Sequence, residues 1–422
     1  MAAAPAGRAH ELTRRLGVGD AVVIGLGAML GAGVFAAFAP AARAAGAWLP
    51  AGLAVAAIVA ACNATSTARL AARHPSSGGV YVYGRERLGP FWGYLAGWTF
   101  VVGKTASCAA MALTFAAYAV PDHQLLAAVT AVLALTALNW RGVHKSAQVT
   151  RVIVAVVLGV LVAVVAAGAV ATPPSVGLLT PADPFPALGV LEAGGLLFFA
   201  FAGYARVATL GEEVRDPAHT IPRAVRTALL VVLVVYAAVG VTALGVLGPE
   251  RLADATAPLA EVVTAAGAGW LAPVVRVGAA LAALGSLLAL ILGVSRTSFA
   301  MARDRYLPAA LDAVHPRHHV PHRAELAVGL VVATLAATVD LRGAIGFSSF
   351  GVLLYYAIAN AAALTLTRAQ ARPARVVPVV GLAGCLLLAA ALPTASVVAG
   401  VIVVAIGAAS YVRVSARRGR RL

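Results

Sequence analysis

Long apolar blocks alternate with short polar or charged connections along the whole chain. A helix that crosses a membrane needs about 20 predominantly apolar residues, and within these blocks the apolar residues follow one another without alternation. This pattern disfavours a membrane β-barrel, whose shorter strands alternate apolar with polar positions. It predicts twelve membrane-spanning helices near residues 18–40, 48–69, 92–119, 124–140, 150–171, 189–209, 224–248, 272–302, 324–340, 343–367, 376–392 and 394–412.

The composition supports this class. Of 422 residues, 61% are hydrophobic and 11% are charged, whereas soluble domains have about 45–50% apolar and about 25% charged residues. Such a chain has too few polar residues to cover a surface that faces water, so soluble and disordered classes are excluded. We expect a tail at 1–17, a first group of five spans at 18–171, an outer loop at 172–188, a second group of five at 189–367, two further spans at 376–412 and a basic tail at 413–422.

The net charge of +16 raises the question of a nucleic-acid partner. The basic residues form short clusters between apolar blocks instead of one groove, which favours an anionic membrane surface as their partner. Assigning both tails and the even-numbered connections to one side leaves only Arg43, Arg251 and Arg342 among the connecting basic residues on the other. We therefore expect a protein of the cytoplasmic membrane, in contact with the lipid bilayer and not with nucleic acid, with both ends in the cytoplasm.

Metal, cofactor and ATP chemistry are not expected. The three cysteines lie inside apolar blocks without a CxxC pair, which disfavours a disulfide framework or a thiolate metal site. Four histidines form a cluster in a basic connection, where an adaptable loop is favoured over a metal site. No GxxxxGK[ST] motif is present, so this chain alone is not expected to drive transport with ATP. The residues concerned are Cys62, Cys108, Cys385, His315, His318, His319 and His322.

The first span is rich in glycine between Gly25 and Gly33. A nucleotide-binding loop is disfavoured because the spacing is not GxGxxG and no strand precedes it. Close helix packing through the GxxxG pair Gly27 and Gly31 is a second interpretation. A third is a helix that breaks at 31–33 and offers free N–H groups and a positive helix end to an anionic group.

The sixth span supports the third interpretation. It carries Gly203 in its middle, and Arg206 follows three residues later. Glycine-interrupted first spans in two five-helix halves are the sequence indication of a midplane substrate site between inverted repeats. We expect an all-α integral membrane fold with a five-plus-five inverted repeat, in which the last two spans are peripheral.

Three motifs carry a resemblance to a known family. They are Leu30-Gly31-Ala32-Gly33-Val34-Phe35, the stretch from Phe198 to Pro222 with its Gly-Glu-Glu-Val and Ile-Pro, and the stretch from Gly285-Ser286 to Leu307-Pro308. Over nearly its whole length the chain resembles the amino acid–polyamine–organocation superfamily of permeases, and within it the cationic amino acid and polyamine branch. The resemblance implies a leucine-transporter-type fold with broken first and sixth helices.

The resemblance also implies an α-amino acid site built mostly from backbone. The substrate carboxylate would lie on N–H groups around Ala32, Gly33 and Val34, and its ammonium on carbonyls of the broken half-helices. Phe199 would cover the bound substrate, while a core or lipid-facing role is the alternative for Phe199 and Phe201. The implied binding residues are Met29, Gly31, Ala32, Gly33, Val34, Phe199, Ala202 and Gly203.

The chain departs from the family pattern at several charged or polar positions. Where the family has a serine in helix 1, this chain has Ala32, and where it has an acid in helix 6, this chain has Ala205. The carboxylate that the family carries in span 3 is missing, and this chain has Gly103-Lys104 there. The lysine that some members carry in helix 5 is absent from 152–158. Losing two acids weakens the case for arginine, lysine or a polyamine as substrate, because a second positive charge would lack a partner.

The membrane interior instead gains cations at Lys104 and Arg206 and, nearer the ends, at Arg276 and Arg296. An ionisable group at this depth costs about 2.5–3.5 kcal/mol on insertion scales and indicates function by default. One hypothesis is that Lys104 or Arg206 supplies a fixed positive charge that makes transport sodium-independent. A second is that they favour neutral or acidic substrates, and the alternative is that they snorkel or bind backbone.

Two acids, Glu212 and Glu213, lie at the predicted cytoplasmic end of the sixth span. A solvated helix end is one interpretation. The other is an inner-gate salt bridge with Arg296 or Arg303 that breaks during transport.

These observations predict a secondary transporter of amino acids that works by alternating access, as proton symport or exchange, with no catalytic residue and no cofactor. A polyamine or organic-cation transporter, a membrane amino acid sensor and an integral-membrane enzyme are the alternatives. The spans contain no histidine, which disfavours the enzyme. A monomer suffices physically, and a homodimer is also compatible.

Overall fold

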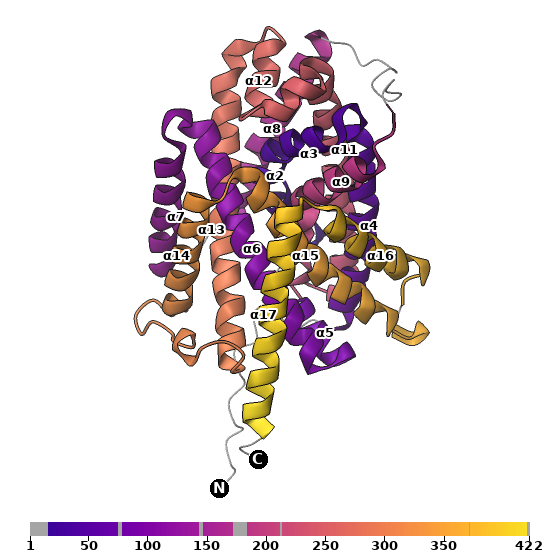
Figure 1. The fold of residues 1–422 in the computed structure, drawn as a ribbon, viewed down its shortest axis with the longest axis vertical. Coiled ribbons are helices and arrows are strands. Elements are labelled where there is room, and N and C mark those ends of the chain that lie inside the picture. Colours follow the sequence, from indigo (N-terminus) through magenta and orange to yellow (C-terminus); the bar gives the residue numbers. More distant parts are fainter. Residues whose placement is uncertain are drawn as a thin grey trace.

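The chain is a bundle of helices in this computed structural model (Figure 1). The structure describes residues 16–74, 78–142, 147–171, 184–211, 213–370 and 372–419. Within them the only strand-like pairing is an isolated parallel bridge between Leu16 and Val214. The Leu16 N–H donates to Glu213 O at 3.1 Å, and the Arg215 N–H donates to Leu16 O at 2.9 Å. This bridge fixes the entry to the first helix beside the exit from the sixth predicted span.

The first predicted group of five spans is built from eight α-helices. The turn between α5 and α6 is set by glycine and proline: α6 begins with Pro90, and Gly89 before it has φ 105°, which favours glycine. The elements are α1 (Val18–Met29), α2 (Ala32–Ala36), α3 (Phe38–Ala45), η1 (Gly46–Trp48), α4 (Leu49–Arg73), α5 (Val80–Leu88), α6 (Pro90–Ala119), η2 (Pro121–His123), α7 (Gln124–Trp140) and α8 (Ala147–Ala171).

The remainder of the chain begins with a second interrupted helix. The longest helix, α11, bends near its end because Gly248 has φ 74° and Pro249 follows it. The elements are α9 (Ala187–Phe201), η4 (Ala202–Tyr204), α10 (Ala205–Ala208), α11 (Pro217–Asp254), α12 (Pro258–Ala265), η5 (Gly269–Leu271), α13 (Ala272–Arg303), η6 (Ala309–Leu311), α14 (His322–Thr338), α15 (Leu341–Leu364), η7 (Arg368–Gln370), α16 (Val376–Ala391) and α17 (Thr394–Gly419).

Every predicted span falls on helix, and the all-helical class is confirmed for the described residues. Ten helical segments among them are long and apolar enough to cross a membrane. The predicted ninth and eleventh spans correspond to α14 and α16, which have 17 and 16 residues and fall below that length. Two helices that the sequence pattern did not predict, α5 and α12, lie in the connections.

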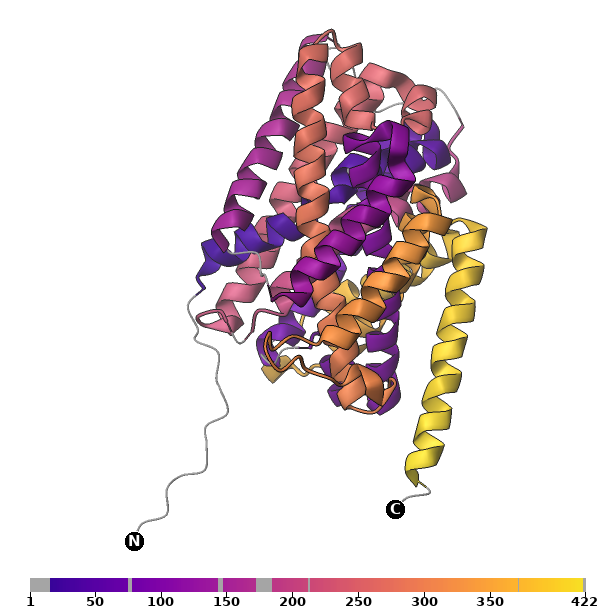
Figure 2. The same ribbon diagram turned by 90° about the vertical axis from the view of Figure 1, so that its left-hand side faces the viewer.

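The bundle has two ends, which we call the α5 side and the α12 side after the short helices that lie there (Figure 1). The connection between α13 and α14 lies on the α5 side (Figure 1). α17 runs along the edge of the bundle and ends on the same side (Figure 2). α13 and α15 pack against α6, and α7 packs against α14.

Small residues allow these helices to approach closely. A Cβ placed on Gly103 of α6 would lie 3.2 Å from the Cα of Gly351 on α15. In lipid, helices associate through such backbone approach and through hydrogen bonds, because lipid tails are as apolar as the side chains. The two glycines therefore allow the close spacing between α6 and α15.

Candidate substrate site at the two interrupted helices

The first helix is interrupted at two residues. α1 ends at Met29, Leu30 and Gly31 have ψ of 42° and −145°, and α2 begins at Ala32. The first N–H groups of a helix have no partner within it, and no side chain in the described part of the chain caps α2. The predicted break is therefore present, one or two residues earlier than the predicted 31–33, so that Ala32, Gly33 and Val34 supply the N–H groups.

The sixth predicted span is interrupted by a tighter turn. α9 ends at Phe201, the 3₁₀ turn η4 covers Ala202–Tyr204, and α10 continues for one turn. A change of helix type frees carbonyl oxygens from the regular ladder. The carbonyl of Ala202 is the one on which other groups converge.

The two interruptions lie against each other through glycine. A Cβ on Gly33 would lie 2.6 Å from the Cα of Ala200, and a Cβ on Gly203 would lie 2.7 Å from the backbone nitrogen of Met29. Real Cβ atoms do not approach that closely, so both positions require glycine for contact between the two backbones. A Cβ on Gly31 would meet the Ser286 hydroxyl of α13.

A tyrosine of α11 joins the two interruptions. The Tyr236 hydroxyl lies 2.6 Å from Met29 O and 3.1 Å from Ala200 O, and its side chain is 1% exposed. The ring of Phe201 packs edge-on against Tyr236 at 5.0 Å. Phe201 is therefore a buried core residue and not a lipid-facing one.

A lysine of α6 reaches the helix-6 interruption. Lys104 is 7% exposed, and its Nζ donates to the carbonyl oxygen of Ala202 at 3.3 Å. The Tyr356 hydroxyl of α15 donates to the same oxygen at 3.4 Å. No ion pair among the described residues includes Lys104. Lys104 therefore binds backbone in this structure, and Ala202 O is one of the three carbonyls, with those of Met29 and Phe199, that the family resemblance implies for the substrate ammonium.

The predicted binding residues are buried together at this place. Met29, Ala32, Val34 and Ala202 are at most 2% exposed, and Phe199 is 8% exposed. Gly31 and Gly33 are also buried, whereas Gly203 is half-buried. The predicted binding geometry at this place stays a prediction.

The predicted gating residues lie on the α5 side of the interruptions. Arg206 on α10 and Arg296 on α13 are exposed, and Glu213 and Arg296 both lie within electrostatic reach of Arg206. Glu213 forms no ion pair among the residues that the structure describes, and Glu212 lies outside them. The inner-gate salt bridge stays a prediction.

The α12 side is closed by a tyrosine and two arginines. The Tyr118 hydroxyl of α6 donates to Phe35 O at 2.9 Å and accepts the Leu259 N–H of α12 at 3.1 Å. Arg276 donates to Tyr118 O at 3.0 Å, so this predicted cation also binds backbone. These contacts tie the end of α6 to α2 and α12.

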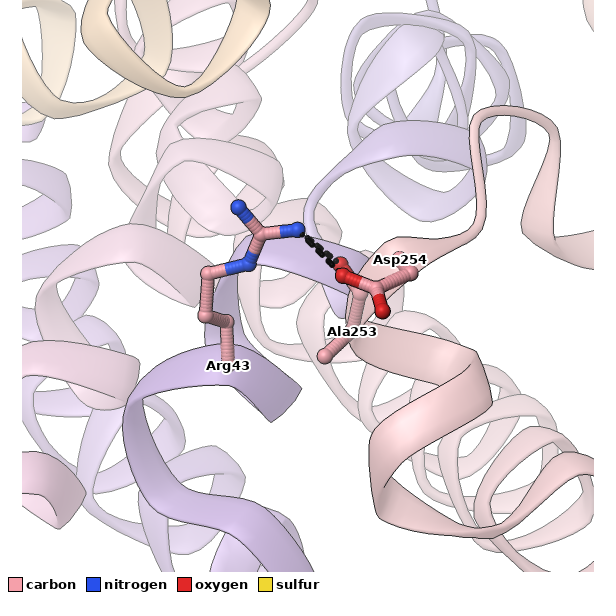
Figure 3. A network of polar contacts seen from close by, with 3 residues as sticks. All are labelled: Arg43, Ala253 and Asp254. Atoms are coloured by element: carbon pink, nitrogen blue, oxygen red, sulfur yellow. Dashed lines mark hydrogen bonds and ion pairs between the residues drawn. The ribbon is translucent and has the colours of Figure 1, made fainter.

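A second contact on the α12 side is exposed. Figure 3 shows Arg43 of α3 reaching toward Asp254 and the carbonyl of Ala253 at the end of α11. The Arg43 guanidinium lies 2.7 Å from the Asp254 carboxylate and 3.0 Å from Ala253 O. Exposed pairs of this kind contribute about 0.2–1 kcal/mol, so the buried Tyr118 contacts dominate the closure.

The α5 side is held by a different set of groups. The Tyr81 hydroxyl of α5 donates to the Asp304 carboxylate at the end of α13, and Arg85 lies 3.3 Å from the same carboxylate. Burial and the Asp304 carboxylate raise the pKa of Tyr81 well above its ordinary value. The hydroxyl therefore keeps its proton and remains a donor at any physiological pH.

Sequence reasoning missed the buried tyrosines that stabilise the interruptions, Tyr236 and Tyr356. It also missed a polar cluster between α4, α15 and α16, in which the Asn360 amide donates to Asn63 Oδ1 at 2.6 Å and the Asn63 amide donates to Cys385 Sγ at 3.2 Å. The available signal was a polar residue inside an apolar span, which in membranes usually has a partner.

Three of the four clustered histidines, His315, His318 and His322, pack ring against ring. His315 lies 4.8 Å from His318 and 5.4 Å from His322 between ring centroids. Among the described residues no group of three or more His, Cys, Asp or Glu side chains is arranged to hold a metal ion.

Comparison with known proteins decides the family, since residues 16–414 match the model described as amino acid permease. The chain belongs to this family. The resemblance to the amino acid–polyamine–organocation superfamily is thereby confirmed. A protein named as an uncharacterized transporter of Mycobacterium tuberculosis (strain ATCC 25618 / H37Rv) is 65% identical over 416 residues, covering 97% of this chain and 94% of that protein.

Two more distant relatives have substrates in their names. The branched-chain amino acid permease of Bacillus subtilis (strain 168) is 29% identical over 384 residues, covering 85% of this chain and 82% of the permease. A vacuolar cationic amino acid transporter of Arabidopsis thaliana is 30% identical over 383 residues, covering 85% of this chain and 60% of that protein. This permease is a multi-pass membrane transporter and not an enzyme.

Proposed function

We propose that this permease moves amino acids across the cytoplasmic membrane by alternating access, with the substrate bound where α1–α2 and α9–α10 are interrupted. The contact between the two interruptions, which requires glycine at Gly33 and Gly203, is the observation that carries the proposal. Discontinuous helices at a repeat interface are the usual place of a midplane substrate site. Twelve spans in a five-plus-five inverted repeat, with α16 and α17 peripheral, complete the proposed architecture.

In the proposed complex the substrate carboxylate accepts hydrogen bonds from the N–H groups of Ala32, Gly33 and Val34. The ammonium meets the carbonyl oxygens of Met29, Phe199 and Ala202, and the Phe199 ring covers the substrate. Opposed helix ends suit a zwitterion because they stabilise both charges without a buried, unpaired side chain. Backbone recognition of the α-carbon groups leaves the side-chain specificity to the surrounding residues.

Lys104 gives the proposed site a fixed positive charge. Its ammonium lies 3.3 Å from Ala202 O, a carbonyl to which a bound cation would otherwise be attracted. We infer that transport is sodium-independent for this reason and that it proceeds as proton symport or exchange. A fixed cation also disfavours substrates with a second positive charge, which favours neutral or acidic amino acids over polyamines.

The distribution of basic residues supports an orientation with the α5 side in the cytoplasm. Both chain ends then lie in the cytoplasm, and Arg206, Glu213 and Arg296 lie on the cytoplasmic side of the substrate site. In this orientation Tyr118 and its partners close the outside, and Tyr81 with Asp304 closes the inside.

Uptake by proteoliposomes tests the proposal. Purified permease is reconstituted and offered radiolabelled leucine, alanine, glutamate, arginine and putrescine, with and without sodium, a pH gradient or the same amino acid inside. We expect saturable uptake of a neutral or acidic amino acid that internal substrate accelerates and that sodium does not change. Uptake of putrescine alone, or of none of the five compounds, would contradict the proposal.

A further inference from the structure

A carboxylate on the first turn of α14 is buried without a partner. Glu325 is 0% exposed, and neither of its carboxylate oxygens accepts a hydrogen bond from a described residue. An ionised carboxylate that is removed from water without hydrogen bonds or a counter-charge is costly. Glu325 therefore favours the protonated form unless a cation approaches it.

The register of α7 against α14 locates the neighbours of Glu325. A Cβ on Gly329 would meet the side chain of Thr136, and a Cβ on Gly142 would lie 3.5 Å from His318 O. The two helices are therefore antiparallel, and Glu325 lies between these two contacts, level with Asn139. The side-chain oxygen of Asn139 is also buried and has no hydrogen-bond partner among the described residues, while its amide donates to Leu288 O of α13 at 3.1 Å.

These two residues are complementary only in one protonation state. A carboxylate and an amide oxygen are both acceptors and repel each other, whereas a protonated carboxyl group donates one hydrogen bond. If Glu325 is protonated, a side-chain rotation would let its carboxyl O–H donate to the Asn139 oxygen. That single hydrogen bond would give both groups a partner. A buried carboxyl group with an unpartnered acceptor oxygen at the same level of the neighbouring helix is suited to hold a proton inside the bundle.

The charged groups around Glu325 are few. Arg296 of α13 is within electrostatic reach of Glu325, and α14 itself carries His322 and Arg323 beside it. α7 contributes Arg141 just beyond its end, and η6 carries no charged residue. From α6 the cation is Lys104, which is bound at Ala202 O.

We propose that Glu325 is the binding site of the proton that drives transport in this permease, with Arg296 as the cation that displaces it. This inference rests on the proposed function. Arg296 is exposed and lies within electrostatic reach of Arg206, which is itself within reach of Glu213. When Arg296 turns toward Glu213, Glu325 takes up a proton; when Arg296 turns toward Glu325, the carboxylate releases that proton and becomes its counter-ion.

Infrared difference spectroscopy of the purified protein tests proton binding without any transport. Spectra of the wild type between acid and alkaline pH should contain the band of a protonated, buried carboxyl group, and Glu325→Gln should lack it. The matched control is Glu250→Gln, because Glu250 is an exposed carboxylate at the end of α11. A band that persists in Glu325→Gln, or that is absent from the wild type at every pH, would overturn the proposal.

Transport then tests coupling. Using the amino acid of the leucine, alanine, glutamate and arginine panel that exchanges fastest, with the membrane potential clamped, each pH unit of gradient should raise wild-type accumulation up to about tenfold. Glu325→Gln should keep amino acid exchange and lose this response, Glu325→Asp should restore it, and Glu250→Gln should behave as wild type.

The outcomes separate the two proposals. If no amino acid of the panel exchanges, the proposed function fails while the infrared band still reports on proton binding. Normal accumulation by Glu325→Gln under a pH gradient overturns the coupling role. Parallel loss of exchange and accumulation in folded Glu325→Gln assigns the residue a structural role and also overturns it.

Discussion

The two helix interruptions of this permease differ in what surrounds them. The interruption of α1–α2 is made of backbone, and no side chain caps the N–H groups that begin α2. At the interruption of α9–α10, by contrast, Lys104 and Tyr356 both donate to the carbonyl oxygen of Ala202. Among the described residues no side chain caps the donor end of the site, whereas the acceptor end is partly occupied.

This difference indicates how the site divides its tasks. Free N–H groups at a helix start attract an anion whatever the rest of the molecule is, so the α1–α2 end suits the group common to all amino acids. The α9–α10 end already holds an ammonium from the protein. A substrate ammonium must share or displace it, and we propose that the protein's own ammonium at this end replaces an external cation.

The largest loss of uptake is expected when a side chain is added at the α1–α2 end. In Gly33→Val the new Cβ would lie 2.6 Å from the Cα of Ala200, and overpacking of this kind costs typically about 1–3 kcal/mol. Since the contact is with backbone, we expect the two interruptions to separate and uptake to fall to background. The control is Gly19→Val, where nothing lies within 4 Å. Wild-type uptake by Gly33→Val would break the comparison.

A smaller effect is expected at the α9–α10 end. Lys104→Met keeps the length of the side chain but removes a charged hydrogen bond, worth about 1.5–3 kcal/mol. We expect uptake without sodium to fall about 10–100-fold, while Cys108→Ala, one turn further along α6, changes uptake little. The initial rate is measured in sodium and in choline media. Unchanged uptake in choline would show that Lys104 does not supply the required charge.

Removing the bridge between the two ends should have a moderate effect. Tyr236→Phe deletes the hydroxyl that donates to Met29 O and Ala200 O and leaves buried carbonyls unsatisfied, at a cost of about 1–3 kcal/mol. We expect a lower unfolding temperature and weaker substrate binding. Tyr411→Phe on the peripheral helix α17 is the control. Equal thermal unfolding curves for the two variants would contradict a bridging role.

The smallest effect is expected at the exposed contact on the α12 side. Arg43→Ala removes the ion pair with Asp254. The side chains of Arg43 and Asp254 are 50% and 81% exposed, so we expect the free energy of unfolding to fall by about 0.2–1 kcal/mol, and by less at high salt. Thermal unfolding at low and high salt measures it. A loss as large as that of Tyr236→Phe would mean that the outer closure depends on this pair.

The sequence predicted the helical class and the two interruptions because continuous apolar blocks and mid-span glycines are local signals. Gly33 and Gly203 were assigned to the site from those signals, and the structure brings both against the other interrupted helix. The predicted edges of the first break, at 31–33, were less accurate, since α2 already begins at Ala32.

The partners of the backbone groups were not predictable in the same way. Tyr236 follows Met29 by more than two hundred residues, and only packing of α11 against α1 brings its hydroxyl to that carbonyl. Glu325 was missed because it lies among polar residues at the start of a span, where a solvated helix end is the ordinary interpretation. Its burial follows from the packing of α7 and α13 against α14.

The most direct test of the substrate site is a structure of this permease with the amino acid that proteoliposome exchange identifies. The account predicts density for the carboxylate within hydrogen-bond distance of the N–H groups of Ala32, Gly33 or Val34, with the ammonium near the α9–α10 carbonyls and Lys104 still close to Ala202 O. Density for the amino acid elsewhere, with the two interruptions unchanged and in contact, would contradict the central claim.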